Sequence, residues 1–148
     1  NYYPADALGC MRELDRPGVA LFERDRLIAD SNIPEDRILK FAVAKVDKDG
    51  YLARIHEKPD ENTVRSLGSP VLVSMNCWVF SPVIFRACRS VRPSPRGELE
   101  LTDAIRDSMD ALGERDRALG FQRSVLDLSS RSDIAAVAAR LRDVTPDP

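Results

Sequence analysis

The sequence is poor in the residues on which several common kinds of protein depend. Its three cysteines, Cys10, Cys77 and Cys88, are odd in number, far apart and outside any Cys-x-x-Cys pair. This pattern argues against a disulfide framework and against a structural zinc site, and it fits a reducing compartment. No apolar run approaches the ~20 residues that a membrane span needs, and no signal peptide is recognisable. We therefore expect a cytoplasmic protein that does not enter a membrane.

Histidine and lysine are scarce as well. The one histidine, His56, has no nucleophile or second metal ligand suggested near it, so we interpret it as a partly exposed turn residue. Only Lys40, Lys45, Lys48 and Lys58 are lysines among 22 basic residues, and the formal net charge is −2. Because such a chain has no basic field to attract phosphate backbones or anionic lipids, we expect no nucleic-acid partner and no membrane-surface binding.

Glycine-rich phosphate loops are missing too. Neither Gly-x-Gly-x-x-Gly nor a P-loop pattern occurs in the 148 residues, so they contain no recognisable triphosphate cradle. The length suits a single domain over residues 1–148. The chain begins Asn1-Tyr2-Tyr3-Pro4, which resembles the end of a strand running into a helix. We therefore expect this domain to be truncated at its N-terminal side.

Strand-like and helix-like patterns alternate along the chain. We predict strands over residues 18–22, 41–46, 51–55, 71–80 and 120–128, and helices over residues 4–14, 82–88, 101–112 and 132–141. A polar loop over residues 30–36 should carry a helical turn near Ile33-Pro34. The Asp-Gly pair in Asp47-Lys48-Asp49-Gly50 predicts a tight hairpin turn, since such a turn needs positive φ. Alternating elements favour an α/β fold with a largely parallel sheet covered on its faces.

Two predicted strand ends carry side chains suited to a phosphorylated ligand, which open α/β sheets bind beyond such ends. Glu57 and Lys58 follow the hairpin, where the carboxylate can accept from a hydroxyl and the ammonium can meet a phosphate. Asp127 lies near the end of the last predicted strand and could hold Mg²⁺ together with water and substrate phosphates. By spacing alone, the first pair also fits a solvated edge and Asp127 also fits a loop cap.

Other charged residues receive ordinary structural interpretations. Glu98 and Glu100 flank Leu99 and could form paired acids, but a role in the loop leading into a helix is favoured. The arginines Arg24, Arg26 and Arg37 are interpreted as a solvated face.

Taken in order, these segments resemble the sugar-1-phosphate nucleotidylyltransferases, also called nucleoside-diphosphate-sugar pyrophosphorylases. The resemblance covers nearly the whole chain, and Glu-Lys-Pro followed by Arg-Gly-Glu-Leu-Glu-Leu-Thr-Asp is its most specific part. The matching segments are Asn1-Tyr2-Tyr3-Pro4, residues 33–46, Asp47-Lys48-Asp49-Gly50, Glu57-Lys58-Pro59, residues 75–80, residues 94–103 and Val125-Leu126-Asp127.

The resemblance implies a fold, a reaction and a set of residue roles. The fold would be Rossmann-like (GT-A-like), with a mixed, mostly parallel sheet, helices on both faces and a β-hairpin insertion. The reaction would join a nucleoside triphosphate to a sugar 1-phosphate and release pyrophosphate, with Mg²⁺. Glu57 would bind sugar hydroxyls, Lys58 the sugar phosphate and Asp127 the metal. Asn76 stands where many members have a glycine that lets the sugar approach, and Phe41-Ala42 stands where many have Tyr-Gly, a sugar contact.

The family's glycine-rich opening loop and a second metal-binding aspartate have no counterpart in these residues. We therefore expect that the chain alone does not turn over. A non-catalytic regulatory or assembly module of the same fold is the alternative, and the joint presence of Glu57, Lys58 and Asp127 favours the enzyme. A nucleotide-binding domain of another family is disfavoured by the missing phosphate loop. The base, the sugar and the oligomeric state, a homo-oligomer included, stay open.

Overall fold

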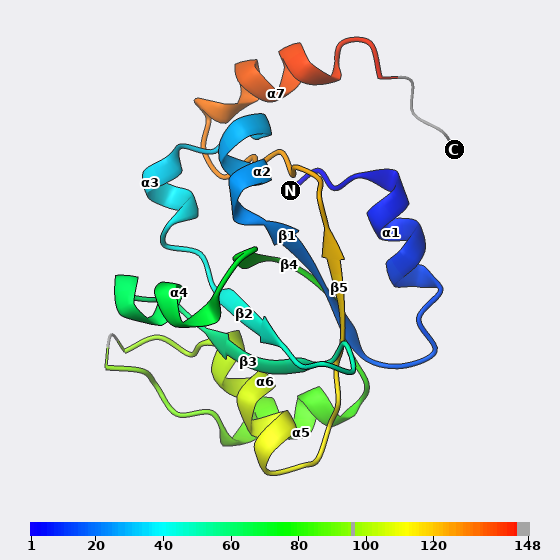
Figure 1. Ribbon diagram of the computed structural model, residues 1–148, viewed down its shortest axis with the longest axis vertical. Coiled ribbons are helices and arrows are strands. Elements are labelled where there is room, and N and C mark those ends of the chain that lie inside the picture. Colours follow the sequence, from blue (N-terminus) through cyan, green and yellow to red (C-terminus); the bar gives the residue numbers. More distant parts are fainter. Residues whose placement is uncertain (96, 145–148) are drawn as a thin grey trace.

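One five-stranded sheet organises the protein in the order β3-β2-β4-β1-β5 (Figure 1). The computed structural model describes residues 1–95 and 97–144, and Arg96 of the expected Arg96-Gly97 loop lies outside them. The strands are β1 (Gly18–Glu23), β2 (Val43–Val46), β3 (Leu52–His56), β4 (Leu72–Val79) and β5 (Arg117–Phe121). The helices are α1 (Ala5–Arg12), α2 (Arg24–Asp30), α3 (Glu35–Ile38), α4 (Glu61–Leu67), α5 (Val83–Ser90), α6 (Leu101–Asp110) and α7 (Asp133–Leu141).

The sheet is mixed but mostly antiparallel, so the expectation of a mostly parallel sheet was wrong. Among the described strands, only β1 and β5 pair in parallel, whereas β1–β4, β2–β3 and β2–β4 are antiparallel. The tight hairpin reverses the chain between β2 and β3, and β4 then inserts between β2 and β1, antiparallel to both. A strand that is buried on both faces has a continuous apolar sequence whether its neighbours are parallel or antiparallel. The sequence pattern therefore could not distinguish the two arrangements.

The continuous apolar run of β1 reflects burial on both faces of the sheet. Val19 and Leu21 pack in one core cluster, together with Ile84 of α5 and Ile105 of α6. The alternate residues Ala20 and Phe22 belong to a second cluster on the other face, which includes residues of α1, α2 and α3. Helices therefore cover both faces, as expected.

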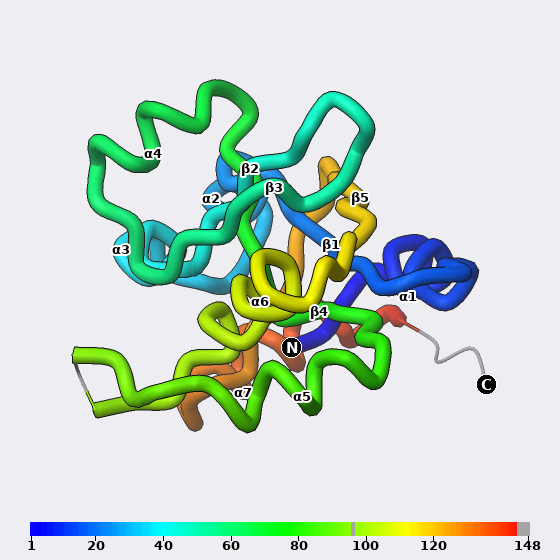
Figure 2. The backbone as a smooth tube through the Cα atoms, turned by 90° about the horizontal axis from the view of Figure 1, so that it is seen from below, coloured from blue at the N-terminus to red at the C-terminus, as the bar shows by residue number. Residues whose placement is uncertain are grey.

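The helices are distributed around the sheet in a simple way. α5 and α6 lie together at one end of the molecule, and α2, α3 and α7 lie toward the other (Figure 1). α4 and the β2–β3 hairpin lie on the side opposite α5 (Figure 2). None of the helices in the described part of the chain is long and apolar enough to cross a membrane.

The predicted hairpin turn is confirmed. Gly50 has φ +80°, which a side chain would resist, and an added Cβ would come within 2.9 Å of the Arg117 guanidinium. Asp47 stabilises the turn, since its Oδ1 accepts hydrogen bonds from the amides of Asp49 and Tyr51, each at 2.9 Å. The hairpin directs β3 back toward Glu57 and Lys58.

The last strand differs from its prediction. β5 begins at Arg117 and ends at Phe121, because its parallel register follows β1 from Gly18 to Phe22. The polar residues 122–124 then leave the sheet, and Leu126 forms an isolated antiparallel bridge with Tyr2. Asp127 therefore follows this separate bridge instead of lying at the end of β5.

Two helices were missed from the sequence, α2 and α4. The N-cap of α4 is Asp60, whose Oδ1 accepts from the Thr63 amide at 2.7 Å, and Gly68 follows its last residue with φ +77°. An Asp N-cap and a glycine beyond the last turn are the usual boundaries of a helix, so these two residues could have revealed it. The expected helical turn near Ile33-Pro34 is present as α3.

Candidate functional site

The centre of β4 carries a bulge that shapes the site. Ala20 of β1 pairs with Cys77, and the next residue, Leu21, pairs with Ser74. Two β4 residues, Met75 and Asn76, are therefore extra in this ladder, and bulges of this kind re-aim side chains. Asn76 has φ +61°, a left-handed conformation that asparagine tolerates better than most residues. Glycine adopts such a conformation without steric cost, so it would fit this position as well.

Next to the bulge lies a small cavity of about 160 Å³, which we call the Asp127 cavity. Its wall is completed from the N-terminal segment, because Asn1 Nδ2 and the Tyr3 hydroxyl both donate to the Met75 carbonyl, at 3.0 and 2.6 Å. Segments from four parts of the chain thus meet here. The cavity is lined by Asn1, Phe41, Ser74, Met75, Asn76, Asp127 and Ser129.

Asp127 is held firmly in this wall. Its amide donates to Asn32 Oδ1 and its carbonyl accepts from Asn32 Nδ2, each at 2.8 Å. Its side chain is only 7% exposed, and Oδ2 accepts from Arg37 Nη2 at 2.5 Å and from Ser129 Oγ at 2.6 Å. These contacts satisfy the buried Oδ2 atom and fix the carboxylate on the cavity wall.

Arg37 lies between two carboxylates. Besides the Asp127 contact, its Nη1 is 4.0 Å from Oδ2 of the buried Asp133. The backbone amide of Ser130 and its hydroxyl, more than the Arg37 charge, lower the pKa of Asp133 below its ordinary value. The interpretation of Arg37 as part of a solvated face was therefore wrong, because two-thirds of the side chain is buried against these acids. Arg24, 27% exposed, departs from that interpretation as well, whereas Arg26, 54% exposed, fits it.

Glu57 and Lys58 line a second cavity of about 360 Å³, the Lys58 cavity, with His56 and Arg106. Glu57 is half-buried and Lys58 is exposed. Lys58 has φ +44°, a conformation that a residue with a Cβ rarely adopts. His56 is half-buried, which confirms the predicted partial exposure, but it is the last residue of β3, so its prediction as a turn residue was wrong.

The two cavities flank the same row of the sheet. Val43 of β2 pairs with His56 on one side and with Val73 on the other, so Glu57, Ala42 and Ser74 are neighbours across three strands. The Ser74 amide donates to the Ala42 carbonyl at 2.8 Å. Strands lie about 4.8 Å apart, so this row is about 10 Å wide, which a phosphorylated sugar can span.

The predicted site residues are therefore brought together in two groups. Asp127 and Asn76 line one cavity, and Glu57 and Lys58 line the other. Ala42 lies between the groups and is only 7% exposed, so it can offer a ligand very little surface. Sequence reasoning missed Ser74 and Arg37 because each enters through a contact with a distant part of the chain. It also missed Ser129, although this residue lies only two positions after Asp127 and donates to its carboxylate.

A magnesium ion is compatible with the Asp127 cavity. Mg²⁺ is usually bound by one or two carboxylates, with water and substrate phosphates completing its shell. Asp127 supplies one carboxylate on the cavity wall, although Arg37 shares its Oδ2. Across residues 1–95 and 97–144, no three or more His, Cys, Asp or Glu side chains gather into a metal-binding group.

Comparison with known proteins adds an independent finding. The nucleotidyl transferase family matches residues 25–140. A low-salt glycan biosynthesis nucleotidyltransferase of Haloferax volcanii is 39% identical over 71 residues, which are 48% of this chain and 18% of that protein. A UTP–glucose-1-phosphate uridylyltransferase of the same organism is 30% identical over 110 residues, 74% of this chain and 42% of that protein. A glucose-1-phosphate thymidylyltransferase of Streptomyces antibioticus is 34% identical over 93 residues, 57% and 24% of the two chains.

The fold has a counterpart among solved structures. A UDP-glucose pyrophosphorylase crystallised with UDP-glucose superposes with a TM-score of 0.61 and 21% identity, covering 90% of this chain and 47% of that one. At that identity the likeness concerns the fold. The chain spans less than half the length of each of these relatives.

Proposed function

The chain belongs to the nucleotidyl transferase family, and on that basis we propose that it forms the sugar-phosphate side of a nucleotidyl-transfer site. The reaction joins a nucleoside triphosphate to a sugar 1-phosphate and releases pyrophosphate. The whole protein would be a cytoplasmic enzyme of NDP-sugar synthesis. The three unpaired thiols agree with a reducing compartment.

One observation carries this proposal. In the described part of the chain, the non-glycine residues at positive φ are Lys58 and Asn76. Lys58 lies two residues beyond the end of β3, and Asn76 lies within β4. Left-handed conformations cost free energy and persist mainly where the surroundings hold them, which is often at ligand sites. Two such residues, each lining a cavity, support a ligand-binding edge here.

Each of the four site residues has a role that follows from its chemistry. Glu57 accepts hydrogen bonds from sugar hydroxyls, and Lys58 neutralises the sugar phosphate. Asn76, at the bulge, leaves room for the sugar beside the β4 backbone. Asp127 would hold Mg²⁺, which neutralises phosphate charge when bound.

Positioning and charge neutralisation supply most of the catalysis in this mechanism. The attacking group is itself a phosphate, so two anions must approach each other, and a general base is not required. Arg37 adds a fixed positive charge next to Asp127 and keeps its carboxylate oriented toward the cavity. The lack of a catalytic histidine is therefore no obstacle to the reaction.

The 148 residues contain no glycine-rich triphosphate loop. We therefore expect the isolated chain to bind a sugar 1-phosphate without turning over. Metal-dependent release of pyrophosphate by this chain alone would contradict that expectation.

A binding titration tests the proposal. Glucose 1-phosphate is titrated into the wild type, into Lys58→Ala and into Lys48→Ala, whose side chain is exposed in the hairpin turn. Loss of a charge-assisted phosphate contact should weaken binding about tenfold or more in Lys58→Ala only. Equal affinities for all three proteins would favour the non-catalytic module instead.

A further inference from the structure

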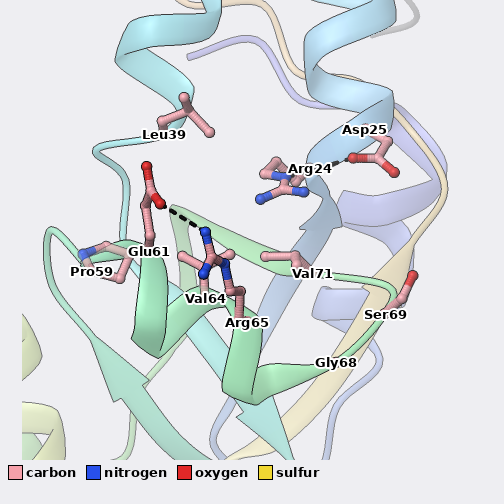
Figure 3. A pocket seen from close by; sticks show the side chains of 10 residues that line it. All are labelled: Arg24, Asp25, Leu39, Pro59, Glu61, Val64, Arg65, Gly68, Ser69 and Val71. Carbon is pink, nitrogen blue, oxygen red and sulfur yellow. Dashed lines mark hydrogen bonds and ion pairs between the residues drawn. The ribbon is translucent and has the colours of Figure 1, made fainter.

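A third cavity, of about 450 Å³, lies apart from the sugar-phosphate row and is here called the Arg24 cavity. Arg24 and Asp25 of α2 lie on one wall, and α4 forms the facing wall with Glu61, Val64 and Arg65 (Figure 3). No role has been given to these residues in nucleotidyl transfer. Leu39 and Val71 complete an apolar lining.

The two arginines present their guanidinium groups to the same space. Figure 3 shows Arg24 extending from α2 and Arg65 from α4, with both heads pointing into the gap between these helices. The Arg24 side chain is 27% exposed, and its Nε is buried without a hydrogen-bond acceptor among the residues that the structure describes. Since a buried donor without an acceptor costs free energy, a shift of the Arg24 side chain that brings Nε to an oxygen of a bound anion would be stabilised.

Neither guanidinium is firmly engaged by the protein. Arg24 Nε is 3.6 Å from Asp25 Oδ1, beyond hydrogen-bond range, and the Asp25 side chain is 84% exposed. Arg65 pairs with Glu61 at 3.0 Å, but both side chains are at least 75% exposed. Exposed pairs one helical turn apart contribute only a few tenths of a kcal/mol. Both heads are therefore available to an incoming anion.

We propose that the Arg24 cavity binds a small organic anion, whose phosphate or carboxylate lies between Arg24 and Arg65 and whose apolar part contacts Leu39, Val64 and Val71. The guanidinium fork matches either oxyanion. Pro59 lines both this cavity and the Lys58 cavity. Occupation of the Arg24 cavity is thus placed to influence the backbone at Lys58.

The test uses phenyl phosphate, which has both a charge and an apolar ring. Calorimetric titration is combined with NMR of the arginine Nε–Hε groups. Wild type should bind, and the Arg24 Nε–Hε signal should shift with the same Kd. Arg24→Gln and Arg65→Gln should each weaken binding about tenfold or more, since each removes a charge-assisted hydrogen bond. Arg26→Gln is the matched control, because Arg26 lies on the same helix and pairs with Asp30 at 3.7 Å.

Three results would overturn the proposal. They are binding of phenol as tight as that of phenyl phosphate, an Arg65→Gln affinity equal to that of Arg26→Gln, and no shift of the Arg24 signal at saturation. Arg65 is 75% exposed, so its variant should fold even if Arg24→Gln does not. Glucose 1-phosphate is titrated in parallel. Lys58→Ala should weaken the binding of glucose 1-phosphate and leave the binding of phenyl phosphate unchanged. The two titrations therefore test the sugar-phosphate site and the Arg24 cavity separately.

Discussion

Replacing Arg37 by glutamine tests how the Asp127 carboxylate is held in its cavity. The substitution removes the charged partner of a side chain that is 7% exposed and leaves Ser129 Oγ as a donor to the same oxygen. Breaking a fully buried pair on one side costs about 3–5 kcal/mol, and an exposed pair contributes about 0.2–1 kcal/mol. Because Arg37 is 33% exposed, we expect a loss of about 2 kcal/mol.

A double-mutant cycle separates this pair from general effects. Asp127→Asn alone leaves Arg37 near Asp133, whereas the double variant removes both charges of the pair. The loss of unfolding free energy in the double variant should therefore be smaller than the sum of the losses in the two single variants. Urea unfolding at pH 7 measures each free energy. In a thermal melt, Arg37→Gln should lower Tm by about 4–8 °C.

The matched control is Arg26→Gln, whose exposed pair with Asp30 should contribute less than about 1 kcal/mol. A coupling energy below about 0.5 kcal/mol between positions 37 and 127 would refute the reasoning. So would an Arg37→Gln variant as stable as the control.

Two further predictions concern stability. Burial, with a smaller contribution from Glu114, raises the pKa of Asp116 from its ordinary value near 3.8 to about 6, so the folded state holds this proton more tightly than the unfolded chain. The stabilisation from the protonated Asp116 is complete below about pH 4 and is lost as pH rises through 6. The free energy of unfolding of Asp116→Asn, measured in urea, should therefore rise relative to that of the wild type by up to about 3 kcal/mol between pH 4 and pH 8. A difference between the two proteins that does not depend on pH would contradict this. Asn76→Gly should unfold at the wild-type temperature or above. Asn76→Val should lose about 1–2 kcal/mol of stability, because a β-branched residue resists φ +61°. Equal melting temperatures for the two variants would contradict the backbone strain at this position.

Local patterns predicted much of the fold from the sequence. The Asp-Gly hairpin at Gly50, the strand from Gly18 and the helix from Leu101 depend on neighbouring residues, and each was found. The direction and order of the strands depend on contacts between distant segments. β4 inserts between β2 and β1, and β5 takes its register from β1, which no local pattern encodes.

The candidate site was likewise predicted where local motifs define it and missed where distant contacts do. Asp127, Glu57 and Lys58 were recognised from short motifs in order along the chain. The ion pair of Arg37 with Asp127 joins residues 90 positions apart, and charge spacing near Arg37 suggested only a solvated face. The bulge at Asn76 depends on a register shift against β1, so it too becomes visible only in three dimensions.

The central claim is that one phosphorylated sugar spans the row between the Lys58 cavity and the Asp127 cavity. Backbone-amide NMR during a titration with glucose 1-phosphate tests it most directly. The account predicts that the amides of Glu57 and Lys58 and those of Ser74 and Asn76 shift together, along curves that give a single Kd. Shifts confined to one cavity, or two groups of amides with different Kd values, would contradict it.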